Sequence, residues 1–311
     1  MNRKSIKIFA PATIANIGPG YDIFGLALHN IGDTIEMSLR SDKQIIIDPI
    51  DGFTNIPVAA DENIAGIVAL EMLKALQIPK GLNINISKNV MPGSGLGSSG
   101  SSAAGAAFAL NELLNRPFSK QELINFAMMG EKATSGKAHA DNVAASILGG
   151  FTVVKGYDPL TIFNIGFPKD LHIAIVHPQV EVKTSDSKKI LKRDMPLEVV
   201  TRQCGNVAGL VAGMTTANYD LISLSMNDYI AEPKRSYLIP AYDQVKKLAL
   251  DNGAIGCSIS GSGPSIFAFT KTEKEAAEIG RLWHEVYAEK DIISKTYTSL
   301  INPEGCKVVN N

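Results

Sequence analysis

A glycine- and serine-rich stretch at residues 92–102 constrains the fold of this chain more than any other segment. Its glycines alternate with other residues, and glycine lets a backbone take positive φ and approach a ligand closely at little steric cost. Alternating apolar and polar residues at 82–86 predict a strand before the stretch, and strong helix formers at 103–110 predict a helix after it. Because free N–H groups and the positive dipole end meet at a helix start, this order of elements predicts a phosphate site.

The loop differs from the common phosphate-binding loops. It lacks the Gly-Lys-[Ser/Thr] ending of the P-loop. Residues 95–100 match the dinucleotide pattern G-x-G-x-x-G, but that pattern needs an acid about 20 residues later, where this chain has Leu-Asn-Arg-Pro at 114–117. A flexible Gly/Ser linker is the plain alternative, and the apolar helix pattern that follows directly argues against it.

Charge and cysteine content argue against several other classes of protein. The net charge of −1 and a pI near 6.5 give no electrostatic reason to expect nucleic acid or an anionic membrane as a partner. The three cysteines are far apart and form no C-x-x-C pair, which favours a reducing, cytoplasmic location over a disulfide framework or zinc site. We expect neither a signal peptide nor a membrane span, because the start lacks an apolar stretch of roughly 7–15 residues and no apolar run is long enough.

Strand-like and helix-like patterns alternate irregularly, which favours an α+β fold over a doubly wound sheet. The patterns predict helices at 62–76, 119–131, 143–148, 185–193, 197–214, 240–251 and 273–289. They predict strands at 4–10, 34–39, 44–47, 151–154, 171–176 and 295–301, with Pro11 ending the first and a loop following over 11–25. A turn-rich segment predicts a junction within 155–170, which divides the chain into domains 1–160 and 161–311.

A second glycine-rich segment, residues 260–265, lies between two apolar strand patterns. Taken alone, an ordinary hairpin turn explains it best. The segment would also suit the wall of a polyanion site, because the N–H groups of Gly261, Ser262 and Gly263 could form an anion-binding nest opposite the first loop.

Phosphoryl transfer from ATP would also need Mg²⁺, which carboxylates, phosphates and water bind. Glu131, at the end of its predicted helix and beside a polar break, is the acid that we expect there. The hydroxyl of Ser98 or Ser99 would be a further ligand. A solvated glutamate at a helix end is the alternative interpretation of Glu131.

Six more polar residues have both a structural and a functional interpretation: Asn16, Asp22, His139, Asp141, Asn142 and Arg235. Asn16 and Asp22 fall in the first predicted loop, where they could cap turns or hold a polar substrate. Asp141 and Asn142 precede an apolar helix pattern and could be its N-cap or contact a substrate. A histidine in this position is more often a hydrogen-bonded surface residue than a base. Arg235 would lie on the surface unless the ligand carries a carboxylate.

Together these motifs resemble the GHMP kinase superfamily, which joins galactokinase, homoserine kinase, mevalonate kinase and phosphomevalonate kinase. The family's loop Pro-x-x-x-Gly-Leu-Gly-Ser-Ser is matched from Met91 or Pro92 to Ser99, and the match is closest to the homoserine kinase branch. Four other segments resemble the family's remaining motifs in the right order: 11–28, 139–151, 230–240 and 261–265. The resemblance implies a ribosomal-protein-S5-like N-terminal domain and a ferredoxin-like C-terminal domain with ATP between them. It also implies ATP-dependent phosphorylation of the side-chain hydroxyl of L-homoserine, in threonine biosynthesis, by a homodimer.

The resemblance further implies roles for individual residues. The triphosphate would lie on Pro92, Gly93, Ser94, Gly95, Leu96, Gly97, Ser98, Ser99, Gly100 and Ser101. The amino-acid pocket would consist of Asn16, Asp22, His139, Asn142, Lys188 and Arg235. Glu131, Asp141 and Asn142 are the catalytic candidates. No general base is assigned, because a loose transition state leaves positioning and charge neutralisation to dominate.

Two positions depart from the family pattern. After Thr184 the family usually continues x-x-Ala-Arg, whereas this chain has Lys188 in place of the arginine. A lysine there would replace a bidentate carboxylate contact by a point charge, so we expect weaker substrate binding or help from neighbouring basic residues. Gly100, where the family often has alanine, is a milder change.

Two other functions stay open at this stage. Another small-molecule kinase of the same superfamily, such as one acting on mevalonate, would share most motifs. Against it, Asp22 suits an α-ammonium and Arg235 an α-carboxylate, which together favour a zwitterionic amino acid. A catalytically silent ligand-binding member would be expected to lack the loop serines or the acid, yet Ser98, Ser99 and Glu131 are all present.

Overall fold

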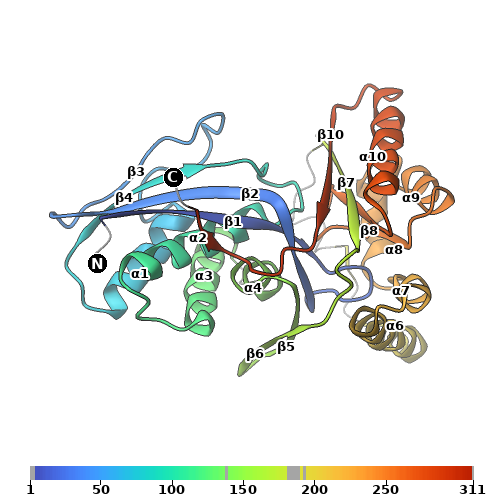
Figure 1. The fold of residues 1–311 in the computed structure, drawn as a ribbon, viewed down its shortest axis with the longest axis horizontal. Coiled ribbons are helices and arrows are strands. Elements are labelled where there is room, and N and C mark those ends of the chain that lie inside the picture. Colours follow the sequence, from blue (N-terminus) through green and yellow to red (C-terminus); the bar gives the residue numbers. More distant parts are fainter. Residues whose placement is uncertain (1–3, 137–138, 181–189, 192–193, 310–311) are drawn as a thin grey trace.

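The computed structural model describes residues 4–136, 139–180, 190–191 and 194–309, and it contains two β-sheets with helices packed on them (Figure 1). The first sheet has seven strands: β1 (Ser5–Ala15), β2 (Phe24–Arg40), β3 (Ile45–Ile47), β4 (Gly81–Ser87), β5 (Phe151–Tyr157), β6 (Leu160–Ile165) and β11 (Lys307–Val308). The second has four: β7 (His172–Pro178), β8 (Gly256–Ile259), β9 (Ile266–Thr270) and β10 (Ser294–Leu300).

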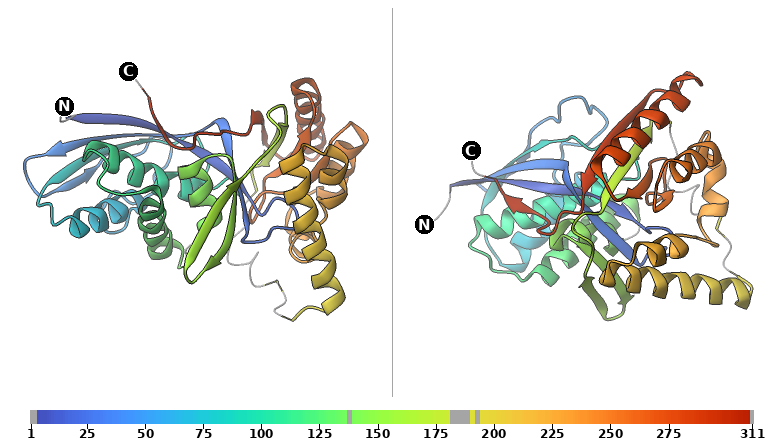
Figure 2. Two further views of the ribbon diagram at one scale, coloured as in Figure 1. Left: turned by 60° about the horizontal axis from the view of Figure 1, so that its bottom comes forward. Right: turned by 45° about the vertical axis from the view of Figure 1, so that its right-hand side comes forward.

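The helices fall into two groups along the chain. The first group is α1 (Ile64–Ala75), α2 (Ser98–Leu113), α3 (Lys120–Ser135) and α4 (Ala140–Leu148). The second is α6 (Leu197–Thr216), α7 (Tyr219–Ser225), α8 (Glu232–Arg235), the 3₁₀ turn η1 (Ser236–Leu238), α9 (Tyr242–Asp251) and α10 (Glu273–Ala288). Figure 1 shows the first group gathered on one face of the first sheet, and Figure 2 shows the same arrangement from two other sides.

The pairing of the strands shows how each sheet is built and how the two sheets are connected. The first sheet runs β11-β1-β2-β4-β3, and β5 with its partner β6 attaches to the other end of β2. The second sheet, β10-β7-β9-β8, is antiparallel throughout. A bridge between Leu28 and Ile301 joins the continuation of β10 to β2. The sheets are therefore connected by backbone pairing as well as by side-chain packing.

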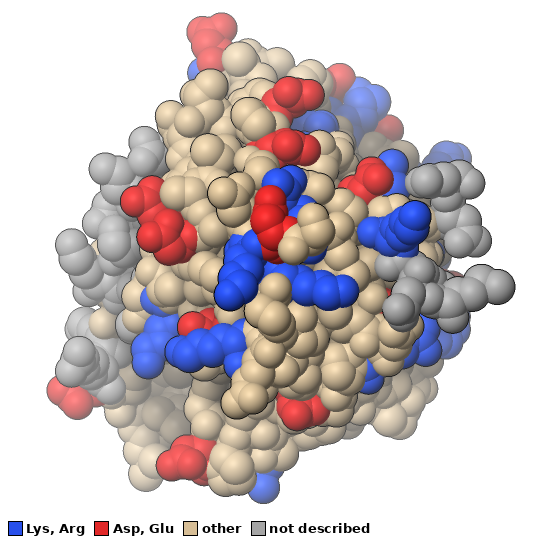
Figure 3. Space-filling view, turned by 90° about the vertical axis from the view of Figure 1, so that its left-hand side faces the viewer, with Lys and Arg blue, Asp and Glu red and all other residues tan. Residues whose placement is uncertain are grey.

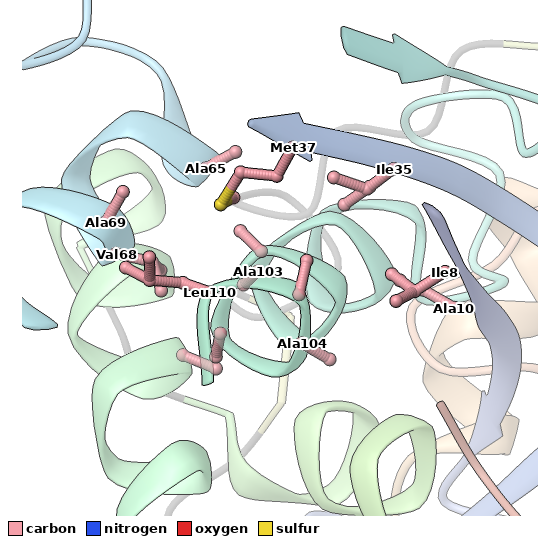
Figure 4. Close-up of a cluster of buried hydrophobic side chains, with 14 of the residues drawn as sticks. Ile8, Ala10, Ile35, Met37, Ala65, Val68, Ala69, Ala103, Ala104 and Leu110 are labelled. Atoms are coloured by element: carbon pink, nitrogen blue, oxygen red, sulfur yellow. The ribbon is translucent and has the colours of Figure 1, made fainter. Parts of the chain in front are cut away.

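Helix α2 is the centre of the first hydrophobic core, and 14 of its 16 residues are buried. Its small side chains, such as Ala103 and Ala104, let β1, β2 and the other helices of the first group approach closely, as Figure 4 shows with Ile8 and Ile35. A Cβ on Gly105 would lie 2.6 Å from Cδ1 of Ile35. The helix start is thus held on a rigid support, which fixes where the loop before it ends.

Most of the predicted elements are confirmed, and the differences have local reasons. The predicted capping box of α3 is present, since Ser119 accepts from the N–H of Glu122 and Glu122 accepts from the N–H of Ser119. The prediction that Pro11 ends β1 is wrong. The register of β1 against β2 shifts between Pro11 and Thr13, and such an irregularity in the pairing can accommodate a proline. The predicted loop therefore starts after Ala15. The helix predicted at 185–193 falls largely outside the described residues.

Two further boundaries differ from the prediction. Helix α3 continues past Glu131 to Ser135, so the glutamate lies within its last turns. Helix α4 begins at Ala140, with His139 as its N-cap residue. Asp141 and Asn142 are therefore inside the first turn, and the prediction that they could cap the helix is wrong.

The predicted division at residue 160 falls in the β5–β6 hairpin, which pairs with the first sheet up to Ile165. Residues 166–171 then lead to β7 in the second sheet. We therefore keep our proposal that the junction between the two domains lies within 155–170. Strand β11 returns to pair with β1 at the end of the described chain.

The surface carries charges of both signs. Figure 3 shows Lys and Arg side chains gathered around an acidic one at the end of the molecule that lies on the left in Figure 1, with other acids nearby. Within the residues that the structure describes, no helix combines the length and the apolar character needed to cross a membrane.

Candidate active site

A cavity of about 1060 Å³ lies where the first glycine-rich loop, the start of α2 and the second glycine-rich loop meet. Twelve of the predicted site residues line it: Pro92, Gly93, Gly95, Gly97, Ser98, Ser99, Gly100, Glu131, His139, Asn142, Gly261 and Ser262. Its size suits a nucleotide together with a small second substrate.

The first loop has the backbone conformation that its glycines allow. Gly93, Gly95 and Gly97 have φ of 75°, 83° and 64°, a region that other residues rarely adopt. Gly97 is the N-cap position of α2, and no side chain of the described residues caps this helix start. The N–H groups of the first turn therefore remain available for an anion, as the sequence predicted.

The second loop packs directly on the first. The Ser260 hydroxyl donates to the Gly95 carbonyl at 2.7 Å, and the Ser265 N–H donates to the Ser94 carbonyl at 3.1 Å. A Cβ on Gly95 would lie 2.6 Å from the Ser260 carbonyl oxygen, so only glycine fits there. The segment does connect two strands, β8 and β9, as a hairpin does. It also forms one side of the cavity, so the two interpretations of this segment are compatible.

A buried ion pair beneath the loop was missed from the sequence. Nζ of Lys88 lies 2.6 Å from Oδ2 of Asp33 and also donates to the Ser98 carbonyl at 3.0 Å. Asp33 in turn accepts from the Val90 N–H at 3.1 Å and from the Ser101 hydroxyl at 3.0 Å. The pair thus ties β2 to both ends of the loop. Asp33 alternates with Ile31, Ile35 and Met37 on one face of β2, so an acid at an otherwise apolar position is the signal that could have indicated the buried carboxylate, although not its partner.

We predict that Lys88→Met destabilises the protein by about 3–5 kcal/mol, because it leaves the Asp33 carboxylate buried without its cation. The double variant Asp33→Asn/Lys88→Met should recover much of this loss, since no buried charge remains. Urea unfolding of both variants and the wild type measures the difference. Equal destabilisation by the single and the double variant would contradict the ion-pair explanation.

Glu131 is buried, at 6% exposure, and lines the cavity near the loop serines. The Ser98 hydroxyl donates to the Val90 carbonyl at 2.8 Å, whereas Ser99 is exposed at the cavity. Among the described residues no group of three or more His, Cys, Asp or Glu side chains is arranged to hold a metal. A cation at Glu131 would therefore take most of its ligands from nucleotide phosphates and water.

Beside this cavity, two of the predicted amino-acid residues, Asn16 and Arg235, meet at the carbonyl of Gly261. That oxygen accepts from Nδ2 of Asn16 at 2.9 Å and from a guanidinium nitrogen of Arg235 at 2.8 Å. Oδ1 of Asn16 accepts from the Asp22 N–H at 3.0 Å, and the Asp22 carboxylate lies 3.5 Å from Nδ1 of His139. An acid and an arginine are thus brought together from segments more than 200 residues apart in the sequence.

Arg235 is a buried cation, with 3% exposure. Burial lowers the pKa of its guanidinium below the usual value, while Tyr21, Asp22 and Asp228 act in the opposite direction. The guanidinium carbon lies 5.1 Å from the centroid of the Tyr21 ring, a cation–π contact. Tyr21, which the sequence analysis did not single out, therefore belongs to this pocket.

Asn142 lies between the two parts of the site. Its Oδ1 accepts from the Thr13 hydroxyl at 2.7 Å, and a Cβ on Gly97 would lie 2.7 Å from the same oxygen. Asp141 does not line the cavity and is buried, at 2% exposure. Burial raises its pKa from 3.8 to about 6, with His139 lowering it and Asp22 raising it to a lesser extent.

The buried Asp141 predicts a pH dependence of stability. Its pKa is higher in the folded state than in the unfolded state, so the folded protein loses stability as pH rises from about 4 to about 6, by about 3 kcal/mol when the group is fully ionised. Asp141→Asn should remove this contribution, so its stability relative to the wild type should be greater at pH 7.5 than at pH 4. Urea unfolding at the two pH values tests this. A difference that is constant with pH would contradict the buried carboxylate as its source.

Three residues predicted to hold the triphosphate do not line the cavity, and one predicted substrate residue cannot be placed. Ser94, Leu96 and Ser101 are buried within the loop and the first turn of α2. Their hydroxyls or apolar groups face the protein: Ser94 accepts from the Leu96 N–H, and Ser101 donates to Asp33. Lys188 lies outside the described residues.

The far end of the cavity was not predicted. It lies between the segment after β3 and helix α1, and it is lined by Ile50, Asn55, Ile56, Pro57, Asp61, Glu62, Asn63, Ile64 and Ile67. Its apolar side chains suit the faces of a flat heteroaromatic ring, and its amide and carboxyl groups suit hydrogen bonds to the edge of such a ring. The cavity therefore runs from an apolar end, past an anion-binding helix start, to a pocket with charges of both signs.

This arrangement defines a class, a small-molecule phosphotransferase with the GHMP kinase fold. The models of the GHMP kinases N terminal domain and C terminal domain match residues 63–150 and 208–289. Homoserine kinase of Chlorobium phaeobacteroides (strain DSM 266) is 40% identical over 98% of this chain and 100% of its own length. Homoserine kinase of Methanococcus maripaludis (strain C5) is 41% identical over 91% and 93%.

Solved structures agree with this class. The crystal structure of homoserine kinase from Cytophaga hutchinsonii has a TM-score of 0.96 at 44% identity, over 99% of this chain and 98% of that one. Mevalonate kinase of L. major has a TM-score of 0.74 at 14% identity, which indicates a common fold only. The chain belongs to the homoserine kinase family of the GHMP kinases. The predicted two-domain α+β fold is thereby confirmed.

Proposed function

We propose that this protein transfers the γ-phosphoryl group of ATP to the side-chain hydroxyl of L-homoserine, a step toward threonine. The observation that carries the proposal is the position of Asp22 and Arg235 beside the two glycine-rich loops. An acid suits the α-ammonium group of an amino acid and an arginine fork suits its α-carboxylate. Membership of the homoserine kinase family supports the same substrate.

ATP would lie along the cavity with its base at the apolar end and its phosphates at the start of α2. The N–H groups of the first turn and of the positive-φ glycines would bind phosphate oxygens. The carbonyl–hydroxyl contacts between Gly95 and Ser260 hold the two loops at a fixed spacing around them. The residues of the two loops that line the cavity would bind the phosphates: Pro92, Gly93, Gly95, Gly97, Ser98, Ser99, Gly100, Gly261 and Ser262. Ser94, Leu96, Ser101 and Gly263 would only hold the shape of the loops.

Mg²⁺ would bind to the buried Glu131 carboxylate, with the exposed Ser99 hydroxyl, or that of Ser98, as a second protein ligand. The acid lines the same cavity as the loop, and a hard cation prefers such oxygen ligands. The ion would neutralise charge that develops on the transferred group.

The acceptor hydroxyl would be positioned by Asn142, which Thr13 holds in place. Asp141 is buried behind it, so its position supports no direct proton transfer from the substrate. Because the transition state of phosphoryl transfer is loose, positioning and charge neutralisation can supply most of the rate enhancement. We therefore assign no general base.

Three further parts of the proposal follow from the sequence. Lys188 would contribute a point charge to the substrate carboxylate, in place of the family's arginine. We expect a cytoplasmic homodimer that has neither nucleic acid nor a membrane as a partner. ATP and L-homoserine would be the small-molecule partners.

A mevalonate-type kinase is the second candidate, because the same fold occurs in mevalonate kinases. Mevalonate has a carboxylate but no ammonium group. It would bring no ammonium group to the Asp22 carboxylate, whereas an amino acid would, and this difference favours the amino acid.

The proposal predicts ADP release that depends on L-homoserine in an assay with ATP and Mg²⁺, with mevalonate, L-serine and L-threonine as competing acceptors. Mass spectrometry should find the phosphate on homoserine. Arg235→Met should raise the KM for L-homoserine roughly 30-fold or more, about 2 kcal/mol, because a buried charge contact is lost.

Arg281→Met, on the exposed face of α10, is the matched control and should leave the KM unchanged. Turnover with mevalonate but not with L-homoserine would support the second candidate. Tight ATP binding without turnover of any acceptor would indicate a silent ligand-binding protein.

A further inference from the structure

Gln203 is a buried polar residue on α6, a helix that is otherwise largely exposed or half-buried. It is 6% exposed, and its amide makes three hydrogen bonds. Nε2 donates to the Pro19 carbonyl at 2.7 Å and to Oδ1 of Asp228 at 2.9 Å, and Oε1 accepts from the Tyr229 N–H at 2.8 Å. The amide therefore joins two segments that are far apart in the sequence.

One of these segments carries Arg235. Asp228 accepts from the N–H groups of Ile230 at 2.8 Å, Ala231 at 3.1 Å and Glu232 at 2.8 Å, which lead into α8. The helix is anchored at its other side too, since the Glu232 carboxylate accepts from the Ser258 hydroxyl at 2.7 Å and pairs with Lys246. Arg235, the last residue of α8, is thus positioned by its helix rather than by its own long side chain alone.

The other segment carries the acid of the same pocket. Pro19 lies in the loop between Asn16 and Asp22, and both of these residues have positive φ, 70° and 55°. Ile17 does so as well, at 47°, which is unusual for a β-branched residue. Such a backbone costs free energy and persists only where surrounding contacts hold it. The hydrogen bond from Gln203 to Pro19 is one such contact.

We propose that Gln203 is a positioning residue for the amino-acid substrate, because it sets the separation between the Asp22 loop and the Arg235 helix. The inference rests on the proposed function, since a zwitterion has its ammonium and carboxylate groups at a fixed distance. A pocket whose two charged sides are free to drift apart would bind one group or the other, but not both well. Gln203 and its partners Pro19 and Asp228 do not line the cavity in which ATP would lie, so we expect ATP binding to depend much less on Gln203 than homoserine binding does.

The test is the variant Gln203→Met, which keeps the length of the side chain and removes its hydrogen bonds. We expect the KM for L-homoserine to rise roughly tenfold or more, while the KM for ATP stays within about twofold and kcat changes less than the KM. A residue needed only for folding would lower the thermal stability and affect both substrates alike.

Asn206→Leu is the matched control. Asn206 lies one turn further along α6, and its Nδ2 donates to the Asn227 carbonyl at 2.7 Å, but it has no bond to the Pro19 loop. It should leave both KM values unchanged. If Gln203→Met does not fold, Gln203→Asn, which is one methylene too short to span both partners, replaces it.

The outcomes separate the two proposals. If the Gln203 variants phosphorylate L-homoserine with the kcat and the KM of the wild type, the positioning role is overturned and the proposed function stands. Equal changes in the KM of ATP and L-homoserine would overturn it as well. A wild-type protein that does not phosphorylate L-homoserine would overturn the proposed function and this inference with it.

Discussion

The packing of the two glycine-rich loops on each other is the interaction on which the rest of the site depends. The first loop precedes α2 on the first sheet, and the second connects β8 to β9 in the other sheet. They meet at Gly95, whose carbonyl accepts from Ser260 and whose missing Cβ makes room for the Ser260 and Gly263 carbonyls. The phosphate site that we propose would therefore form only when both sheets have formed and are in contact.

Two features of the first sheet and its helices stabilise the contact between the two glycine-rich loops. The alanine-rich helix α2 packs against the strands so closely that its start has little freedom to move. The Asp33–Lys88 ion pair then ties the loop to β2, because a buried charge that loses its partner costs free energy. A third support, Gln203, acts on the amino-acid side of the site. These contacts would fix the parts of the site that we propose for the phosphates and for the amino acid, as phosphoryl transfer by positioning requires.

Local signals in the sequence predicted a large part of this arrangement. Glycines that need positive φ and the capping box of Ser119 and Glu122 depend on neighbouring residues, so they could be identified. Contacts between distant residues could not, since Lys88 and Asp33 are 55 residues apart and Gln203 and Pro19 are 184 apart. Pro11 was misjudged for a related reason, because only the pairing with β2 reveals the irregularity that accommodates it.

The most direct test of this account is the ATP affinity of Gly95→Ala, measured by calorimetry against Gly52→Ala. Both glycines have positive φ, 83° and 78°, so both variants carry similar backbone strain. A Cβ on Gly95 collides with the second loop, whereas one on Gly52 has nothing within 4 Å. The account predicts that Gly95→Ala weakens ATP binding by roughly tenfold or more, about 1.4 kcal/mol, while Gly52→Ala does not. Equal ATP affinity of the two variants would contradict it.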